Sequence, residues 1–291
     1  MKKVLLLIYL LSLAQVVYNY CNCCDQCGQQ QEQQQGQQQQ EYQQPTGSCP
    51  EIRFINGGLS GSGFASRYWD CCKPSCSWSS NAGYGNEARH CDANMNILTD
   101  NNAASKCDGG PSTTCLSQIP FTINGCDNIG FAFGAVPGAG PNICGRCFLL
   151  EFTGEGKYET KDNHRALKNK KLVVMASNIG YDVAGGQFDI MIPGGGVGLF
   201  NGCGNIFSGN MGQQYGGLLS DCENEVGWSG SDYEIHIRRK ECLKRKCENT
   251  FNGNTLAKEG CLFLANFMEA AGNPLHSYKE IECPQILKDK Y

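Results

Sequence analysis

Two aspartates stand in segments whose composition suits catalysis. Asp70 lies in the stretch SRYWDCCKPSCSW (66–78), among three cysteines, a tyrosine and two tryptophans, and Asp189 lies in QFDIMIP, directly before a run of glycines. Two carboxyl groups on opposite sides of one cleft can act as a general base and a general acid. Because the two aspartates are 119 positions apart, their spacing alone also allows each to be a solvated surface acid. Which interpretation holds depends on whether the strands and loops that carry the two aspartates bring them to one cleft.

The segment around Asp189 alternates like a β-strand. Phe188 and Ile190 fall on one face of such a strand, while Asp189 and Met191 fall on the other. This pattern directs Asp189 away from the main apolar stripe. In the PGGG run that follows, missing side chains let a ligand approach the backbone, so we expect these glycines to form the floor of a groove.

The rest of the chain from Cys49 to Tyr291 predicts one loop-rich β domain. Candidate strands, each ended by turn residues, cover 146–152, 171–177 and 187–193. Helical periodicity is weak except at 257–272. No second break in composition and no internal repeat occurs, so we expect an all-β barrel or sandwich with long disulfide-tied loops at 49–291.

The N-terminal region differs in composition from this domain. A cationic start and an apolar run predict a signal peptide at 1–19. A cysteine-rich stub and a linker follow at 20–48, and all but four residues of 29–44 are glutamine. With 20 cysteines in the chain, we expect disulfides and a secreted protein, extracellular or in a digestive compartment reached through the secretory pathway.

Charge and motif content limit the partners. The net charge of −4 creates no field that would recruit nucleic acid or an anionic membrane, so a neutral or polar partner is expected. The four histidines form no HExxH or paired cluster, and the CDQC at 24–27 has no second ligand pair. We therefore expect no metal, no cofactor, no nucleic-acid or membrane partner, and a monomer.

Several motifs are similar to those of one enzyme family. SRYWDCCKPSCSW resembles the signature of glycoside hydrolase family 45 endoglucanases, and FDIMIPGGGVG (188–198) resembles the second motif of that family. CDANMNILTD from Cys91, GGLLS after Tyr215 and NPLHSYKEIECP from Asn273 also match. The resemblance covers about residues 60–285 in the same order.

This resemblance implies a six-stranded double-psi β-barrel with a few short helices. It also implies a secreted endo-β-1,4-glucanase that hydrolyses internal bonds of β-1,4-glucan, such as cellulose or mixed-linkage glucan, with inversion at the anomeric carbon. Carried over by position, Asp70 is the general base and Asp189 the general acid. Asp182 matches a third family aspartate on a lid loop, where it either assists the reaction or is a solvated loop acid.

The resemblance further implies substrate contacts around the base. We expect Tyr68 near the cleaved bond and Trp78 under a more distant glucose, because the apolar faces of sugars stack on aromatic rings. Trp69 should point inward, since neighbours on an extended segment face opposite ways. The other candidates for substrate binding are Arg67 and Lys73, which equally suit structural ion pairs, and Tyr215.

Disulfide pairs also follow from the family alignment. They are Cys71–Cys203, Cys72–Cys107, Cys76–Cys144, Cys91–Cys115, Cys147–Cys283 and Cys247–Cys261. An apparent insertion at 221–246 would be closed by Cys222–Cys242. The cysteines left without an assigned partner are Cys21, Cys23, Cys24, Cys27, Cys49 and Cys126.

Two other classes of protein compete with a glucanase. A non-hydrolytic glucan-binding or wall-loosening protein of the expansin type uses a related barrel and keeps an acid like Asp189 but lacks the base at the position of Asp70. The intact RYWDCC context favours hydrolysis. A purely structural cysteine-rich protein accounts for the disulfides but not for two matched acids. One departure from the family is Gln187, where a histidine is common.

Overall fold

A computed structural model describes residues 44–137, 142–180, 183 and 185–291. These residues belong to one compact unit, Gln43–Tyr291. The signal peptide expected at 1–19 and most of the expected stub and linker at 20–48 lie outside the described residues, so both stay predictions. None of the helices in the described part of the chain is long and apolar enough to cross a membrane.

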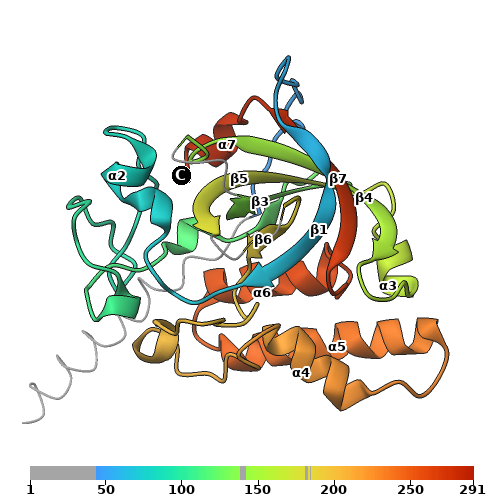
Figure 1. Cartoon of the computed structure of the whole chain (residues 1–291). Helices are drawn as coiled ribbons and strands as arrows, with labels where there is room; N and C mark the ends of the chain where they lie inside the picture. The colour runs from blue at the N-terminus through green and yellow to red at the C-terminus, as the bar shows by residue number, and fades with distance from the viewer. Residues whose placement is uncertain (1–43, 138–141, 181–182, 184) are drawn as a thin grey trace, which may run out of the picture. The chain divides into compact units, whose positions relative to one another are not determined.

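Seven strands form one sheet whose pairings close into a ring (Figure 1). The sheet order is β2-β3-β5-β4-β7-β1-β6, and β3 also pairs with β6, so six strands form the ring and β2 extends from β3. The predicted all-β class is confirmed, whereas the double-psi connectivity stays a prediction. The strands are β1 (Ser60–Tyr68), β2 (Phe121–Thr122), β3 (Ile129–Pro137), β4 (Cys147–Gly156), β5 (Lys171–Gly180), β6 (Phe188–Met191) and β7 (Pro274–Ile281).

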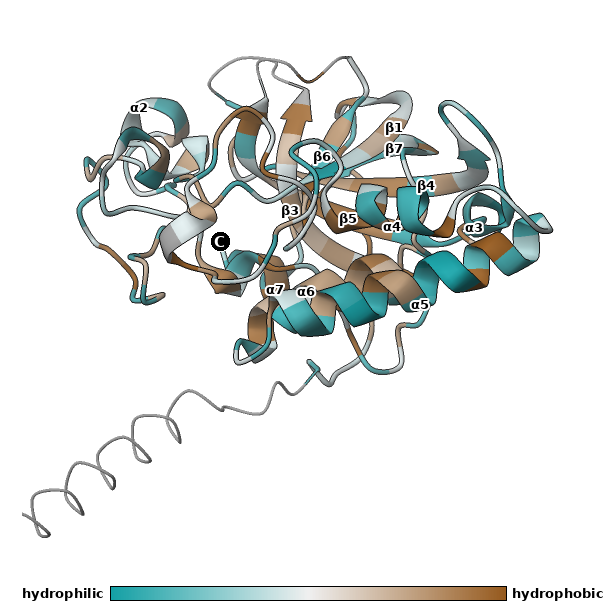
Figure 2. Ribbon diagram, turned by 90° about the horizontal axis from the view of Figure 1, so that it is seen from below, coloured by the Kyte–Doolittle hydropathy of each residue, from teal (hydrophilic) through white to brown (hydrophobic). Residues whose placement is uncertain are grey.

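Two strands of the ring, β3 and β5, have apolar residues on both faces. Within β5, every residue from Leu172 to Ser177 is buried, and its parallel partner β3 carries the fully buried Phe131 and Phe133. Strands covered on both faces read as nearly continuous apolar runs. Figure 2 shows β3 and β5 largely in the hydrophobic colour. The three strands expected from the sequence correspond to β4, β5 and β6.

An aromatic cluster includes one histidine. Phe188 of β6 lies edge-on to His276 and to Tyr278 of β7, with ring centroids 5.3 and 5.0 Å apart. His276 is almost completely buried, and burial lowers its pKa to about 4. The histidine is therefore a neutral member of the packed interior at ordinary pH.

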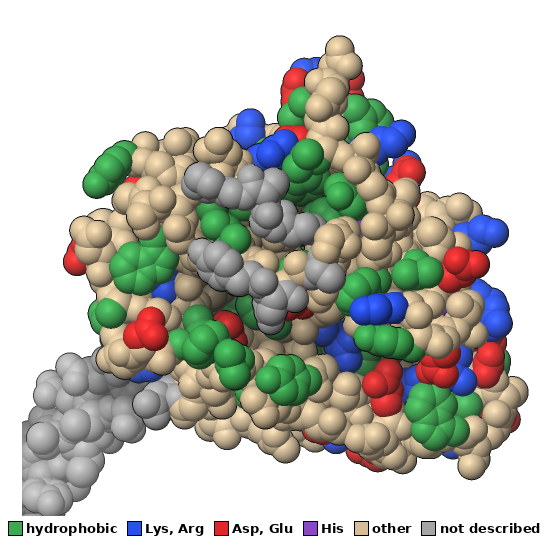
Figure 3. Space-filling view, in the orientation of Figure 1, with side chains coloured by type: hydrophobic (Ala, Val, Ile, Leu, Met, Phe, Trp, Pro, Cys, Tyr) green, Lys and Arg blue, Asp and Glu red, His purple; other side chains and the backbone are tan. Residues whose placement is uncertain are grey.

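The insertion at 221–246 folds as a helical hairpin, and one of its helices is longer than expected. Ser231 and Glu234 form a capping box at the start of α5, and Cys222–Cys242 joins α4 to α5. In Figure 3, Lys and Arg side chains lie among Asp and Glu over this region. The helix expected at 257–272 corresponds to α6, which ends earlier, at Asn266. The helices are α2 (Ser79–Ala82), α3 (Asp162–Arg165), α4 (Gly217–Val226), α5 (Asp232–Thr250), α6 (Thr255–Asn266) and α7 (Gln285–Lys288), with 3-10 turns η1 (Ser75–Ser77), η2 (Lys106–Asp108), η3 (Leu116–Gln118) and η4 (Cys203–Asn205).

Eight disulfides lie in the described part of the chain and tie its loops and helices together. Seven of them are the pairs named from the sequence, including Cys222–Cys242. The eighth, Cys49–Cys126, joins the two unassigned cysteines that lie in the described part of the chain. The other unassigned cysteines, Cys21, Cys23, Cys24 and Cys27, lie outside it. Each bond that closes a long loop restricts the unfolded chain and stabilises the fold by about 3 to 5 kcal/mol in the entropic model.

Candidate active site

The parallel pair β1 and β6 brings the two candidate catalytic segments together. In its register, Ser66 faces Asp189 and Tyr68 faces Met191, and the Ile192 amide donates to the Tyr68 carbonyl at 3.0 Å. Asp70 follows the last residue of β1 by two positions. The register therefore places the segment that carries Asp70 beside the segment that carries Asp189.

The backbone at Asp70 is fixed on both sides. The Gly202 amide donates to its carbonyl oxygen at 2.8 Å, and the next residue, Cys71, has a left-handed φ of 58°. Non-glycine residues rarely adopt this conformation unless the surrounding structure holds them there. Here the disulfides of Cys71 and Cys72, with Cys203 and Cys107, supply that constraint.

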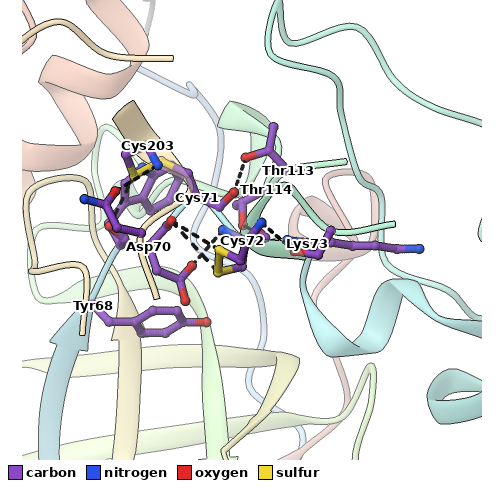
Figure 4. The surroundings of a disulfide bond; sticks show 12 residues. Tyr68, Asp70, Cys71, Cys72, Lys73, Thr113, Thr114 and Cys203 are labelled. Atoms are coloured by element: carbon purple, nitrogen blue, oxygen red, sulfur yellow. Dashed lines mark hydrogen bonds between the residues drawn. A yellow bond between two sulfur atoms is a disulfide. The ribbon is translucent and has the colours of Figure 1, made fainter. Parts of the chain in front are cut away.

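Two threonines complete the support behind Asp70. The hydroxyls of Thr113 and Thr114 donate to the carbonyl oxygens of Cys71 and Cys72, at 2.6 and 2.7 Å. Figure 4 shows these threonines on the side of the segment away from the Asp70 carboxylate. The segment therefore has hydrogen bonds as well as covalent bonds that aim Asp70.

The Asp70 carboxylate is a stronger base than an ordinary aspartate. It is half-buried, and burial raises its pKa to about 6, against the opposing effect of the Cys72 amide, which donates to Oδ1 at 2.9 Å. The group is therefore ionised above pH 6 and has the basicity that proton removal needs.

Asp189 lies near a half-buried cation. Desolvation lowers the pKa of the Arg67 guanidinium overall, while the negative charges of Glu223 and, to a smaller extent, Asp189 oppose that effect. The Nη2 of Arg67 donates to the Gly216 carbonyl at 2.8 Å. On the same two strands, the amide of Gln187 donates to the Ser66 hydroxyl at 2.7 Å. Arg67 thus joins the Asp189 neighbourhood to the start of α4.

The environment of β6 corrects two details of the strand interpretation. Met191, expected on the less apolar face, is buried, and the Ser177 hydroxyl lies 3.2 Å from its sulfur. The glycines at 194–196 are buried too. A Cβ at Gly195 would lie 2.9 Å from the Tyr68 nitrogen, and one at Gly196 would lie 2.9 Å from the Gly216 nitrogen. These glycines make room for the protein's own backbone and are not an open groove floor.

Tyr68 is held by a residue that sequence reasoning missed. The Asn178 side-chain amide donates to the Tyr68 hydroxyl at 3.1 Å, and its carbonyl oxygen accepts from the Ser75 amide at 2.9 Å. In Figure 4 the Asp70 carboxylate points to the side on which the Tyr68 ring lies. Trp69, between them in sequence, is buried, as expected.

Lys73 and Trp78 contact each other. The Lys73 Nζ lies 3.4 Å from the centre of the Trp78 ring and donates to the carbonyls of Asn101 and Ala103 at 2.7 and 3.0 Å. Lys73 is buried, and Trp78 is half-buried. The ammonium therefore supports the indole ring from behind and ties it to the loop at 101–103.

Exposed side chains surround the loop that follows β6. Tyr215 is 66% exposed, and its neighbour Gln214 exchanges hydrogen bonds of 2.7 and 2.8 Å with Gly198. Leu199 and Phe200, also exposed, lie between Gly198 and Gly202, the residue that donates to Asp70. Sequence reasoning passed over these two, although adjacent large apolar residues inside a glycine-rich loop are a signal for a contact surface.

Asp182, the expected assisting acid, lies outside the described residues. No group of three or more His, Cys, Asp or Glu side chains in the described ranges is arranged to hold a metal ion. The candidate site is therefore built here on Asp70, Asp189 and the side chains that support them.

Comparison with known proteins places the chain among the glycoside hydrolases, enzymes for which two carboxylic acids are the usual machinery. A family model described as Glycosyl hydrolase family 45 matches residues 62–228. The chain belongs to glycosyl hydrolase family 45.

Named relatives and a solved structure agree with this assignment. Endoglucanase B of Cellvibrio japonicus (strain Ueda107) is 40% identical over 240 residues, which are 80% of this chain but 45% of that protein, so the chain spans less than half of it. An endoglucanase of Cryptopygus antarcticus is 35% identical over 82% of this chain and 92% of that protein. The crystal structure of cellulase from the Antarctic springtail Cryptopygus antarcticus aligns with a TM-score of 0.61, at 35% identity, over 80% of this chain and 96% of that one.

Proposed function

We propose that this glycoside hydrolase is an endo-β-1,4-glucanase that cleaves internal bonds of β-1,4-glucan with inversion. The observation that carries the proposal is the β1–β6 register, which sets Asp189 beside the strand whose continuation carries Asp70. The relatives named above are endoglucanases or a cellulase by name, which gives the expansin-type alternative no support.

In the proposed reaction, Asp70 is the general base. Its carboxylate takes a proton from a water molecule as the water oxygen attacks the anomeric carbon. Asp189 gives its proton to the glycosidic oxygen as the bond from that oxygen to the anomeric carbon breaks. Water enters on the face opposite the leaving group, so the configuration inverts, which needs carboxyl groups about 6.5 to 9.5 Å apart.

The other site residues have proposed roles in binding and alignment. Tyr68 would contact the sugar at the cleaved bond, where Asn178 fixes its hydroxyl. Trp78 would carry a more distant glucose on the ring face away from Lys73. Tyr215 would contact the chain from the exposed loop before α4. We assign Arg67 and Lys73 supporting positions, because both donate to backbone carbonyls.

The wider setting of the enzyme is also proposed. Cellulose or mixed-linkage glucan is the expected substrate of a monomer, and Asp182 is the expected assisting acid. The eight disulfides suit an oxidising compartment. This supports secretion with residues 1–19 as a signal peptide, 20–48 as a stub and linker, and 49–291 as the catalytic domain.

The test is the release of reducing ends from carboxymethylcellulose and mixed-linkage β-glucan. Wild type should cleave both, whereas Asp70→Asn and Asp189→Asn should each lose at least about a hundredfold in kcat. NMR of the first product should show the α-anomer. A wild-type protein that binds without cleaving, an Asp189→Asn variant at full rate, or an initial β-anomer would contradict the proposal.

A further inference from the structure

Trp228, in the loop between α4 and α5, is exposed yet held in place. Its side chain belongs to a residue that is 60% exposed. The Arg239 guanidinium carbon lies 4.5 Å from the centre of its ring, and the Lys161 Nζ lies 4.9 Å from it. A tryptophan covered on both faces could not remain so exposed. The two cations therefore leave a large part of the ring open to solvent.

Arg239 is unusual for an arginine because it is 2% exposed. Its Nε and Nη2 have no hydrogen-bond partner among the described residues, and its nearest carboxylate, Glu223, is 3.9 Å from Nη1. A buried guanidinium is costly when its donors are unpaired. The π face of Trp228 is thus a principal partner of this charge, and the contact fixes the orientation of the indole.

The loop that carries Trp228 is anchored on the segment at α3. Lys161 lies 3.5 Å from a carboxylate oxygen of Glu159 and 3.7 Å from one of Asp232 at the start of α5. Arg165 of α3 lies 3.5 Å from the other oxygen of Asp232. These ion pairs join two segments far apart in sequence. A ring that is already positioned loses little conformational entropy when a ligand binds.

Two more exposed aromatic residues belong to the anchored segments. Tyr158 precedes Lys161 by three positions, and Tyr233 follows Asp232 directly; both are exposed. In Figure 3, hydrophobic side chains lie among Lys, Arg, Asp and Glu over the corner formed by α3 and α5. This mixture favours a ligand with apolar faces and a rim of hydroxyls over a protein partner, which would need a continuous apolar patch.

We propose that Trp228, oriented by Arg239 and Lys161, is a second glucan-binding platform outside the catalytic site. The apolar face of a glucose ring would stack on the open part of the indole, and nearby carboxylates and cations would bond its hydroxyls. The choice of β-glucan as ligand rests on the proposed function. The platform stands where the family match ends, at residue 228, and α5 lies beyond it, so its supporting arginine comes from outside the matched segment.

Binding to insoluble cellulose tests the platform. The partition of the full chain between solution and phosphoric-acid-swollen cellulose is measured in the cold for wild type, Trp228→Ala and Trp228→Tyr. Phe54→Ala is the matched control, because Phe54 is a 55% exposed aromatic residue beside a lysine, Lys279, and its backbone is bridged to Ile281 of β7 and not to α3 or α5. Thermal unfolding of each variant checks the fold.

The platform predicts a weaker partition for Trp228→Ala by about tenfold, equivalent to about 1.4 kcal/mol, partial recovery in Trp228→Tyr, and no change in Phe54→Ala. In Trp228→Ala, the rate on insoluble cellulose divided by the rate on a soluble cello-oligosaccharide should fall together with the partition. Equal partition of Trp228→Ala and wild type would overturn the platform even if wild type cleaves glucan. Conversely, a wild type that binds through Trp228 without cleaving would overturn the proposed function and leave the platform standing.

Discussion

The side-chain amide of Asn178 donates a hydrogen bond to the hydroxyl oxygen of Tyr68 across the two strands β5 and β1. The same side chain accepts from the Ser75 amide, so one residue connects the tyrosine beside the base to the turn that precedes Trp78. The proposed binding positions on either side of Asp70 therefore share a support.

Removing that support should slow the enzyme without unfolding it. Asn178→Ala is expected to lower kcat/KM on cello-oligosaccharides by about tenfold, because a hydrogen bond of this kind contributes about 1 kcal/mol and the Tyr68 ring gains freedom. Tyr68→Phe removes the same bond and keeps the ring. If the two positions act through this bond, the double variant loses less than the sum of the two single losses; strict additivity would contradict the link.

The pH dependence of kcat/KM should reflect the protonation of Asp70. Since the pKa of this carboxyl is raised to about 6, the group is protonated at lower pH and cannot accept the proton of water. We expect kcat/KM to fall about tenfold for each pH unit below 6. The measurement is a profile on a soluble substrate, with tryptophan fluorescence at each pH to verify the fold. An acid limb near pH 4 would show that Asp70 titrates like an exposed aspartate.

Lys73 should act on substrate affinity through Trp78. Lys73→Met keeps the length of the side chain but loses the cation under the indole and both carbonyl contacts. We expect KM for long cello-oligosaccharides to rise about three- to tenfold, with a smaller change in kcat. Lys73→Arg, which retains the charge, serves as the control and should recover most of the affinity. An unchanged KM in Lys73→Met would mean that the ring needs no such support.

The charge beside Asp189 gives a separate test. Arg67→Gln removes a cation that interacts with Asp189. Because a nearby positive charge favours loss of a proton, its removal should move the alkaline limb of kcat/KM to higher pH. Arg67→Lys should leave the limb near its original position. If the alkaline limb of the kcat/KM profile moves equally in Arg67→Gln and Arg67→Lys, the cause is the lost hydrogen bond to Gly216 and not the lost positive charge.

His276 should make the fold sensitive to acid. Its pKa in the folded protein is about 4, below the value of about 6.5 for an unfolded histidine. Between these values the unfolded chain binds the proton more tightly, so the free energy of unfolding falls as the pH drops from about 6.5 to 4, by about 3 kcal/mol in total. Above pH 6.5 this contribution is constant.

Denaturant unfolding across this range checks the histidine. His276→Phe, which suits an aromatic neighbourhood of Phe152, Phe188 and Tyr278, should flatten the acid dependence. In His276→Phe the free energy of unfolding should still fall somewhat at low pH, because burial also lowers the pKa of His90 and of His164. An equal slope in wild type and His276→Phe would contradict this account.

Patterns of two kinds in the sequence predicted much of this structure. The alternation in QFDIMIP and the apolar runs at 146–152 and 171–177 predict strands because the periodicity of side chains is local. The disulfide pairs named from the family resemblance occur in the structure. Cysteines at matching positions of related chains lie in matching loops, so they form the same pairs. Both kinds of pattern are contained in the order of residues.

Other features depend on contacts that no local pattern contains. Helix α5 has a strongly polar sequence, and its position depends on the Cys222–Cys242 bond and on pairs such as Arg245 with Glu225. Asn178 stands near the end of β5 like many other polar residues, and its role is visible only in the fold, where Ser75 and Tyr68 lie beside it. Backbone from two distant segments lies against the glycines at 194–196. The glycine run therefore predicted an open groove at a place that the protein's own backbone fills.

The strand that carries Asp189 also closes the ring, since β6 lies between β1 and β3. Its partners in β1 are separated from it by more than a hundred residues, and contacts of this separation form late because they require large loops to close. Because the ring is built largely from pairings of this kind, with β1 and β7 separated by more than two hundred residues, activity in refolding should return only after these long-range pairings have formed. In the proposed mechanism, a partly folded chain in which β6 is not yet paired would have Asp70 in place but would lack the general acid Asp189.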